Sequence, residues 1–469
     1  MRVQPSTDPL FFPIEQITRL LKRHELSPVE LVELTLDRIA KSNSSINTFL
    51  TVPAEIARQQ AKAAERQIRR NGPKTPLHGV PVSLKDNIFT GGIRTTAGSK
   101  ILADFVPDHD ADVAARLAAA GAILIGKTNL HEFAYGITSE NPHFGPVRNP
   151  WAQDRISGGS SGGSAASIAC GMGFASIGTD TGGSSRVPPA LCGIVGLKPT
   201  FGLVSLEGVV PLAPSLDHAG VLARSVADAC ILLESIAGNY PRAARPPSHH
   251  KLRENLPKPL RLGWPKNFFF DRVDAEVRKA IDAAAKMFES LGARFVEVAL
   301  PHLTDAVDPS TDIALAEATY YHQSQGYFPN RADDYGSDVR GRLEAGASVP
   351  ALAYLRAFDV KRALERDFAG AFERADAILA PASPIPAPRI GENEVELNGR
   401  KETIRGLLVG MCRPANFTGL PAISIPCGFT SAGLPIGLQL IGPRWQERTL
   451  LSIAQHYEQA TPWHTCHPA

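Results

Sequence analysis

Two glycine- and serine-rich segments carry hydroxyl groups that could act in nucleophilic catalysis. The segment SGGSSGGS covers residues 157–164, and GTDTGGSS covers residues 178–185. Glycines beside a serine allow the backbone to turn sharply and let successive N–H groups point to one place, which is how an oxyanion hole is built. Ser160 and Ser184 are about one helix apart along the chain, so the two segments can converge on one site.

Lys85 is the third candidate, because it ends the apolar stretch GVPVSL and precedes Asp86 and Asn87. Burial disfavours the charged form of a lysine, so such a lysine can be neutral near pH 7 and accept a proton. Serine–lysine pairs carry out nucleophilic catalysis without a histidine. The residue types therefore predict a serine–lysine site, in which the role of each serine is still open.

The segment SGGSSGGS also fits other uses of glycine-rich loops. A phosphate-binding loop is excluded, because that motif needs a lysine after its last glycine and Gly163 is followed by Ser164. Gly158, Ser160 and Gly162 match the G-x-S-x-G elbow of α/β-hydrolases, but any glycine–serine tract matches this pattern by chance. That fold would also need an acid and a histidine. A binding scaffold without catalysis is a further alternative.

An α/β fold is predicted around these residues. From Leu77 to about Gly238, short apolar runs such as GVPVSL and AILIG alternate with helical stretches such as DADVAARLAAAGA. An earlier helix is predicted to start after Ser27, because this serine, the following proline and Glu30 have the spacing of a capping box. The predicted sheet is buried and lies between helices.

The second half of the chain predicts further elements of the same sheet. A helix from Asp274 to Gly292 leads into the strand RFVEV, and residues 310–375 are expected to be largely helical. DAILAPAS, LPAISIPCGF and LPIGLQLIG are predicted strands, and ERTLLSIAQHYEQA is a predicted helix. The proline-rich, polar stretch from Pro241 to Lys258 predicts an exposed connection.

Composition and charge exclude several classes of protein. The chain has 469 residues, 43% of them hydrophobic and 20% charged, which allows a large buried core. A net charge of +2, from 49 basic and 47 acidic residues, argues against a nucleic-acid partner. No apolar run approaches the ~18 residues of a membrane span. The N-terminus also lacks a signal-peptide pattern, so we expect a cytoplasmic protein without membrane contact.

Cysteines and histidines do not form a metal-binding pattern. The six cysteines lie far apart without a C-x-x-C pair, which favours reduced thiols over a zinc site or a disulfide framework. His78, His131 and the pair His249–His250 lack the spacing of metal ligands, so we interpret them as structural or surface groups. We expect neither a metal nor a cofactor.

Four segments together resemble the amidase signature family: GVPVSLKDN, SGGSSGGSAAS, GTDTGGSSRVPPALCGIVGLKPTFG and FTGLPAISIPCGF. The resemblance is most specific from Leu77 to Phe201. It implies a single large α/β/α domain over residues 1–469, around a mixed, mainly parallel, twisted sheet. The core signature region would cover about 77–240 and 375–469, with a variable helical region for the substrate pocket at about 300–375.

The resemblance also implies a role for each candidate residue. Lys85 corresponds to the catalytic base, Ser160 to a proton-relaying serine with a cis peptide bond, and Ser184 to the acyl-forming nucleophile. Ser185 stands where many members have isoleucine, and both Ser185 and Ser161 remain alternatives as nucleophile. The remaining implied site residues are the backbone amides of Thr181, Gly182, Gly183 and Ser184 as oxyanion hole, Asp180 and Arg186 as supports of this loop, and Phe133, Tyr135 and Phe144 as the acyl pocket.

The implied activity is hydrolysis of a carbon–nitrogen acyl bond in a linear amide, an aryl amide or a carbamate, as in a urethanase. The alternative within the family is the A subunit of glutamyl-tRNA amidotransferase, a glutaminase that works inside a complex. That subunit usually carries a segment like D-P-x-x-M-Y-x-x-D-x-x-T, where this chain has RGLLVGMCRPANFTGLPA. We therefore favour a stand-alone hydrolase with a small amide or carbamate substrate, acting as a monomer or homodimer.

Overall fold

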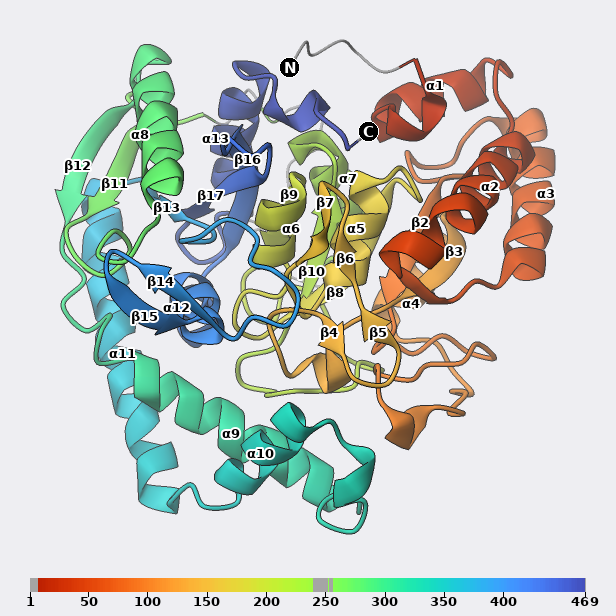
Figure 1. Ribbon diagram of the computed structural model, residues 1–469. Coiled ribbons are helices and arrows are strands. Elements are labelled where there is room, and N and C mark those ends of the chain that lie inside the picture. Colours follow the sequence, from red (N-terminus) through yellow and green to blue (C-terminus); the bar gives the residue numbers. More distant parts are fainter. Residues whose placement is uncertain (1–6, 239–251, 253–255, 469) are drawn as a thin grey trace.

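The computed structural model describes residues 7–238, 252 and 256–468. Its centre is an eleven-stranded sheet with helices on both faces (Figure 1), so the predicted mixed α/β fold is confirmed. In spatial order the strands are β1 (Phe49–Thr51), β3 (Ile123–Thr128), β2 (Pro81–Lys85), β8 (Ala175–Asp180), β10 (His218–Ala223), β9 (Val195–Lys198), β16 (Ala422–Phe429), β17 (Pro435–Ile441), β13 (Ala377–Pro381), β11 (Arg261–Pro265) and β12 (Arg294–Val298).

Parallel pairing is confined to two parts of this sheet. β2 runs parallel to β3 and β8, and β11 runs parallel to β12 and β13. The strands between β8 and β13 pair antiparallel, and so do β1 and β3. The parallel share is thus smaller than the resemblance implied, partly because β16 and β17 are joined directly as a hairpin. Among the described residues, three small hairpins lie outside the sheet: β4 (Glu140–Asn141) with β5 (Gly145–Pro146), β6 (Arg148–Asn149) with β7 (Ala152–Ile156), and β14 (Glu394–Leu397) with β15 (Arg400–Thr403).

The predicted helices are present, and several begin where the sequence predicts. Ser27 caps α2 with Glu30 as a capping box, and Asp274 caps α8. The α-helices are α1 (Ile14–Lys22), α2 (Pro28–Ile46), α3 (Ala54–Asn71), α4 (Asp112–Ala119), α5 (Gly162–Ala169), α6 (Val187–Cys192), α7 (Val226–Ile236), α8 (Ala275–Ser290), α9 (Val307–Ser324), α10 (Ser337–Gly346), α11 (Ala351–Arg374), α12 (Ile404–Phe417) and α13 (Glu447–Gln459). Short 3₁₀ helices are η1 (Pro9–Phe11), η2 (Lys100–Leu102), η3 (Glu132–Ala134), η6 (Ala332–Asp334) and η7 (Trp463–Thr465).

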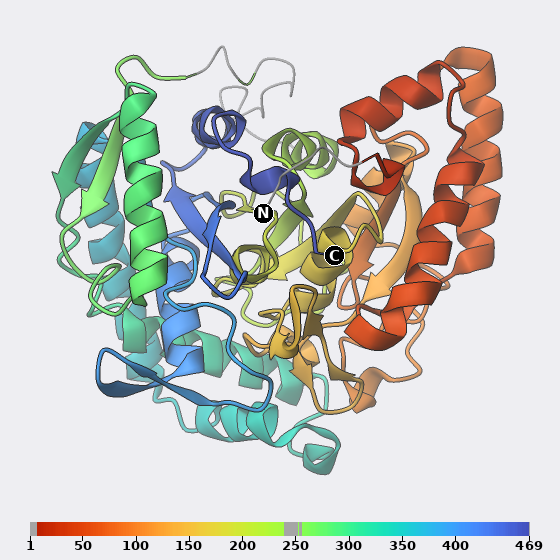
Figure 2. The ribbon, with the colours of Figure 1, turned by 45° about the horizontal axis from the view of Figure 1, so that its top comes forward.

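The sheet is buried on both faces because successive residues of each strand point to opposite sides. In β13, Leu379 belongs to the apolar cluster that includes residues of α7, α8 and α13, whereas Ile378 and Ala380 belong to the cluster that includes residues of α6, α11 and α12. Figure 2 shows α7, α8 and α13 together on one side of the sheet. These two apolar clusters, one on each face of the sheet, fix the positions of the strands. The loops that follow the strands therefore start at defined places along the edge of the sheet.

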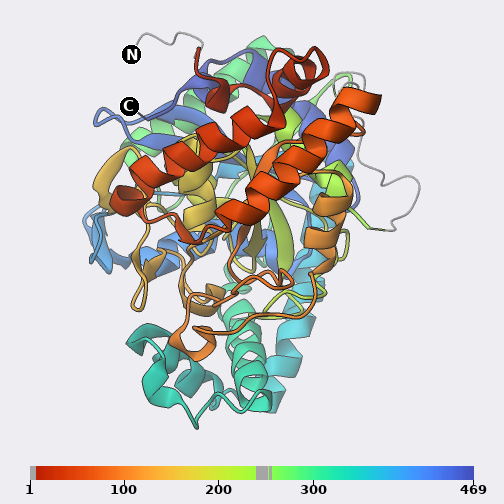
Figure 3. The ribbon, with the colours of Figure 1, turned by 90° about the vertical axis from the view of Figure 1, so that its right-hand side faces the viewer.

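The region 300–375 is helical, as predicted, and it extends beyond the sheet. α9 packs against α10 and α11, and the three helices form the lower part of the molecule in Figures 1 and 3. The predicted connection from Pro241 to Lys258 lies almost entirely outside the described residues. Among those that are described, no helix combines the length and the apolar character that crossing a membrane requires.

Candidate active site

Lys85 and the loop that carries Ser184 meet at one edge of the central sheet. Lys85 is the last residue of β2, and β2 pairs in parallel with β8, where Leu84 is opposite Ile177. The carboxyl ends of parallel strands lie at the same edge, which is where α/β sheets bind ligands. The residues that follow β8 therefore emerge next to Lys85.

The Lys85 amine is fully buried and contacts two hydroxyl groups. Its Nζ atom lies 2.7 Å from Ser160 Oγ and 2.7 Å from Thr179 Oγ1. Burial lowers the pKa of Lys85 to about 7, although the carboxylates of Asp180 and Asp217 favour its charged form. A lysine with this pKa is partly neutral at pH 7 and can accept a proton.

The two glycine- and serine-rich segments converge, as their spacing predicts. The peptide bond between Gly159 and Ser160 is cis, as the family resemblance implied. The hydroxyl of Ser161 donates to the Thr179 carbonyl at 3.1 Å, and the Thr179 N–H donates back to Ser161 Oγ at 3.4 Å. These bonds fix the loop before α5 to the end of β8.

Ser184 differs from its neighbouring serines in exposure. Ser161 and Ser185, the alternative nucleophiles, are fully buried, and both hydroxyl groups donate to the Thr179 carbonyl. Ser184 is 5% exposed and lines a small pocket. Its hydroxyl group has no hydrogen-bond partner among the described residues. It is the serine of this loop that a substrate can reach.

Position 183 of the Ser184 loop requires glycine, and Gly182 lies close to an arginine side chain. Gly183 has a φ of +122°, and a Cβ atom there would lie 2.7 Å from the Cβ of Cys412. A Cβ atom at Gly182 would lie 2.9 Å from Arg413 Nε. α12 carries both neighbours, so a larger residue at position 183 would displace this helix, whereas one at position 182 would displace the end of the Arg413 side chain.

The Ser184 loop offers three backbone donors to a substrate rather than the predicted four. The N–H of Gly183 donates to the Asp180 carboxylate at 2.7 Å, which takes it out of the predicted oxyanion hole. In the described part of the chain, the N–H groups of Thr181, Gly182 and Ser184 donate to no acceptor. The structure thus removes Gly183 from the predicted set and leaves the other three as candidates.

A buried ion pair between Arg186 and Asp180 lies against the Ser184 loop. Arg186 Nε and Nη2 donate to the two carboxylate oxygens of Asp180, each at 3.0 Å. Asn416 Nδ2 donates to Asp180 as well, at 2.8 Å. Burial alone would raise the pKa of Asp180, but the Arg186 guanidinium holds it well below its usual range. Asp180 and Arg186 thus lie in contact with each other beneath the loop, and their role as its supports stays a prediction.

Replacing Arg186 by methionine is expected to lower the free energy of unfolding by about 3–5 kcal/mol, because it leaves the Asp180 carboxylate buried without its cation. Urea denaturation followed by circular dichroism measures this loss. Arg340, whose partly exposed side chain pairs with Asp333 at the surface, serves as the control, and its change to methionine should cost less than about 1 kcal/mol. Equal losses for the two variants would contradict a supporting role of Arg186.

A second carboxylate holds the start of the loop. Asp217 accepts hydrogen bonds from Thr181 Oγ1 at 2.5 Å and from the N–H groups of Leu212 and Ala213 at 2.8 and 3.0 Å. Burial raises the pKa of Asp217 to about 6, against the effect of these hydrogen bonds. The sequence analysis did not assign Asp217, Thr179 or Asn416. Asp217 and Asn416 could have been noticed as polar residues within largely apolar segments, at 216–222 and 414–421.

The structure brings one of the three predicted pocket aromatics, Tyr135, to the Ser184 pocket. Phe133 is instead buried at η3 against the rings of His322 and Tyr335, so it belongs to the core between η3 and α9–α10. Phe144 lies in the β4–β5 turn, where its carbonyl accepts a hydrogen bond from Asn47. The structure therefore does not place Phe133 or Phe144 in the lining of the Ser184 pocket, which corrects the prediction for these two residues. The pocket is completed by Ala134, Gly136, Ile137, Thr181, Gly182, Leu212, Arg405, Val409 and Arg413.

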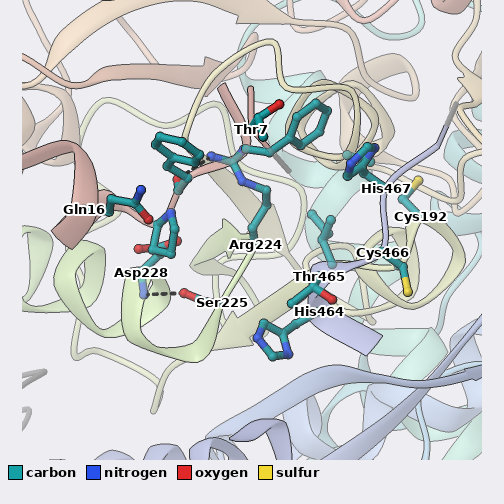
Figure 4. A pocket seen from close by; sticks show the side chains of 16 residues that line it. Thr7, Gln16, Cys192, Arg224, Ser225, Asp228, His464, Thr465, Cys466 and His467 are labelled. Carbon is teal, nitrogen blue, oxygen red and sulfur yellow. Dashed lines mark hydrogen bonds between the residues drawn. The ribbon is translucent and has the colours of Figure 1, made fainter. Parts of the chain in front are cut away.

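A larger cavity, of about 490 Å³, lies away from the catalytic candidates. Arg224 and Asp228, at the start of α7, and His464 and Cys466, near the C-terminus, line it (Figure 4). None of the predicted catalytic residues borders this cavity. The described residues also contain no cluster of histidine, cysteine and acidic side chains that could hold a metal ion. His249 and His250 lie outside the described residues.

Comparison with known proteins decides the family. A model of the amidase family matches residues 30–451. The chain belongs to the amidase family. The predicted resemblance is confirmed, and with it the prediction of an enzyme that acts on carbon–nitrogen bonds.

The relatives in the amidase family include amidotransferase A subunits as well as a hydrolase, the two alternatives that the sequence analysis left open. The chain is 41% identical to the A subunit of the glutamyl-tRNA(Gln) amidotransferase of Carboxydothermus hydrogenoformans, over 98% of this chain and 99% of that protein. The same subunit of Thermotoga maritima superimposes with a TM-score of 0.80, at 33% identity over 99% and 98% of the two chains. A 6-aminohexanoate cyclic dimer hydrolase superimposes with a TM-score of 0.89, at 30% identity over 99% of both chains.

These relatives correct the predicted partners. The sequence analysis expected a monomer or homodimer with a small substrate and no nucleic acid. Relatives with 41% identity over nearly the whole chain are named as one subunit of an enzyme for glutamyl-tRNA(Gln). This finding overturns the expectation and favours the amidotransferase alternative over the stand-alone hydrolase. The balanced charge of the chain did not carry this information, because one member of a complex need not itself be strongly basic.

Proposed function

We propose that the chain cleaves a carboxamide through an acyl-enzyme on Ser184. The contact of 2.7 Å between Lys85 Nζ and Ser160 Oγ, at a lysine with a pKa of about 7, carries this proposal. The neutral amine accepts the proton of Ser160, and Ser160 accepts that of Ser184 as Ser184 Oγ attacks the amide carbon. The proton returns through Ser160 to the leaving nitrogen, and water then hydrolyses the ester.

The N–H groups of Thr181, Gly182 and Ser184 stabilise the oxyanion in this proposal. Each such donor is worth about 3 kcal/mol of transition-state stabilisation. Asp217 supports them because it holds the Thr181 side chain, and Asp180 supports them because it holds Gly183 and Ser185. The carboxylates therefore act on the loop and not on the substrate.

The full-length relatives support glutamine as the substrate and ammonia as the product. In this proposal the chain serves as the A subunit of a glutamyl-tRNA(Gln) amidotransferase, and the ammonia passes to a partner protein that holds the aminoacyl-tRNA. We propose that residues 1–469 act as one amidase domain within that assembly.

We expect the chain to co-purify with amidotransferase subunits of its own organism and to release ammonia from glutamine faster in their presence. Co-expression followed by size-exclusion chromatography and a coupled ammonia assay measures both. The Ser184→Ala variant is the control, because it should still assemble but release no ammonia. The proposed role within a complex fails if no complex forms and glutamine is not hydrolysed.

A second candidate is hydrolysis of a different amide or of a carbamate. The lining of the Ser184 pocket favours this second candidate. Arg405, Val409 and Arg413 line the pocket, and its described lining contains no carboxylate that could pair with the α-ammonium group of glutamine. The higher TM-score of the cyclic dimer hydrolase points the same way. A panel of primary amides, p-nitroanilides, carbamates and esters, compared with glutamine by kcat/KM, decides between the candidates.

A further inference from the structure

Two arginines beside Ser184 have no acidic partner. Arg405 and Arg413, both on α12, line the Ser184 pocket, and neither forms an ion pair with any residue that the structure describes. Arg413 is 7% exposed. Buried guanidinium groups are normally paired with a carboxylate, because an unpaired charge loses its hydration without compensation.

Arg413 keeps one free donor, its Nε, beside the oxyanion loop. Its Nη1 donates to the Ser310 carbonyl at 3.2 Å, whereas its buried Nε has no hydrogen-bond partner in the described chain. The same Nε lies 2.9 Å from the position of a Cβ atom at Gly182, so this face of the guanidinium borders the oxyanion loop. A donor that is buried, charged and unused beside the reaction site is suited to bind a ligand.

Arg405 is held among other cations. Its guanidinium lies 6.0 Å from the ring centre of Tyr135, and the guanidinium of Arg342 lies 5.4 Å from the same ring centre. Burial, followed by repulsion from Arg342 and Arg413, lowers the pKa of Arg405 to about 9. The nearby Asp338 attracts Arg405, but it already pairs with Arg342 at 3.1 Å and with His131 at 2.8 Å.

The remaining lining of the pocket is uncharged, so the arginines determine its charge. Arg405, Val409 and Arg413 also line a neighbouring cavity whose other walls include Phe268, Leu303 and Phe417. The two cavities adjoin at the arginines. A ligand whose reacting carbonyl lies at Ser184 can therefore extend to the arginines with its distant end.

We propose that Arg405 and Arg413 bind a carboxylate of the substrate, so that the preferred substrates are amides that carry a carboxylate at the end remote from the scissile bond. This proposal rests on hydrolysis at Ser184. The carboxylate supplies the missing counter-ion of the buried Arg413 and the half-buried Arg405, and a bidentate guanidinium–carboxylate contact fixes the distance from the anchor to the reacting carbon. The pocket holds no matching carboxylate for an ammonium group, so an amine on the substrate is not required.

The test compares amides that differ only in this carboxylate. Succinamate and glutaramate carry it, and butanamide and pentanamide have the same carbon number without it. We expect kcat/KM to be about 10- to 100-fold higher for one or both of the charged amides, chiefly through KM, because a charge-assisted hydrogen bond to a buried group contributes this much. In Arg405→Met the preference should fall at least about tenfold, and Arg405→Lys should restore part of it. Arg340→Met, at a partly exposed arginine of α10, should keep the preference.

Binding measured without turnover separates this proposal from the proposed function. Calorimetry on the Ser184→Ala variant should show that glutaramate binds more tightly than pentanamide, and that adding Arg405→Met or Arg413→Met removes the difference. If this binding preference holds but the wild-type enzyme hydrolyses none of the amides, the hydrolase function is wrong and carboxylate recognition stands. If charged and neutral amides are hydrolysed and bound equally, carboxylate recognition is wrong.

Discussion

Replacing Ser184 by alanine is expected to lower kcat/KM for an amide substrate on the order of 10⁴- to 10⁶-fold, because no other group of the site can form the acyl-enzyme. The neighbouring hydroxyl groups do not substitute for it. Those of Ser161 and Ser185 are fully buried and bound to the Thr179 carbonyl. The residual rate then comes from the oxyanion donors and from substrate binding alone.

Covalent labelling measures the same prediction independently of substrate choice. A fluorophosphonate probe should attach to Ser184 of the wild-type enzyme, and mass spectrometry of the digested protein identifies the modified peptide. Ser184→Ala should lose the label, whereas Ser185→Ala, which differs by one position, should still be labelled. If the Ser184→Ala protein were still labelled at another residue to the same extent, Ser184 would be excluded as the nucleophile.

Replacing Lys85 by methionine is expected to lower kcat/KM about 10²- to 10⁴-fold, the usual contribution of a general base. Methionine fills a similar volume, but it cannot accept the proton of Ser160. Because Lys85 is fully buried, the thermal unfolding temperature of the variant must be measured alongside its rate. Near-wild-type turnover in a folded Lys85→Met variant would rule out the lysine as base.

The pH dependence of the wild-type enzyme follows from the same residue. The pKa of Lys85 lies near 7, and only the neutral amine accepts a proton. Below about pH 7 the amine is protonated, so kcat/KM should fall about tenfold per pH unit as the pH decreases. Above that pH it should level off until another group titrates. A rate that is constant from pH 5 to 9 would show that the base has a different pKa.

The local elements were predictable because their signals are local. The capping box at Ser27 and the apolar runs of β2 and β3 depend on residues a few positions apart, and the structure has these elements where the sequence places them. The convergence of the two glycine-rich segments was also predicted from their spacing, and the structure adds that the parallel β2–β8 pair places Lys85 beside the Ser184 loop. That residues 1–469 form a single domain stays a prediction.

Contacts between distant segments were not predictable from one sequence. Asn416 contacts Asp180 across 236 positions, and the α12 arginines reach Ser184 from beyond position 400. Phe133 was misplaced for the same reason, because its partners His322 and Tyr335 lie 189 and 202 positions away. The sequence shows an aromatic residue near a glycine, but not which cavity the ring enters.

The sequence by itself determined the chemical groups of the candidate site and the order in which they appear. It contains a lysine at the end of an apolar strand and two serines in glycine-rich turns, and these types restrict the chemistry to proton transfer and acyl transfer. Only the tertiary structure decided which donors remain free. It places the Gly183 N–H on Asp180, leaves the Ser184 hydroxyl facing the pocket, and brings two unpaired arginines beside it. The physical reason is that burial and pairing depend on neighbours from every part of the chain, whereas residue type and spacing do not.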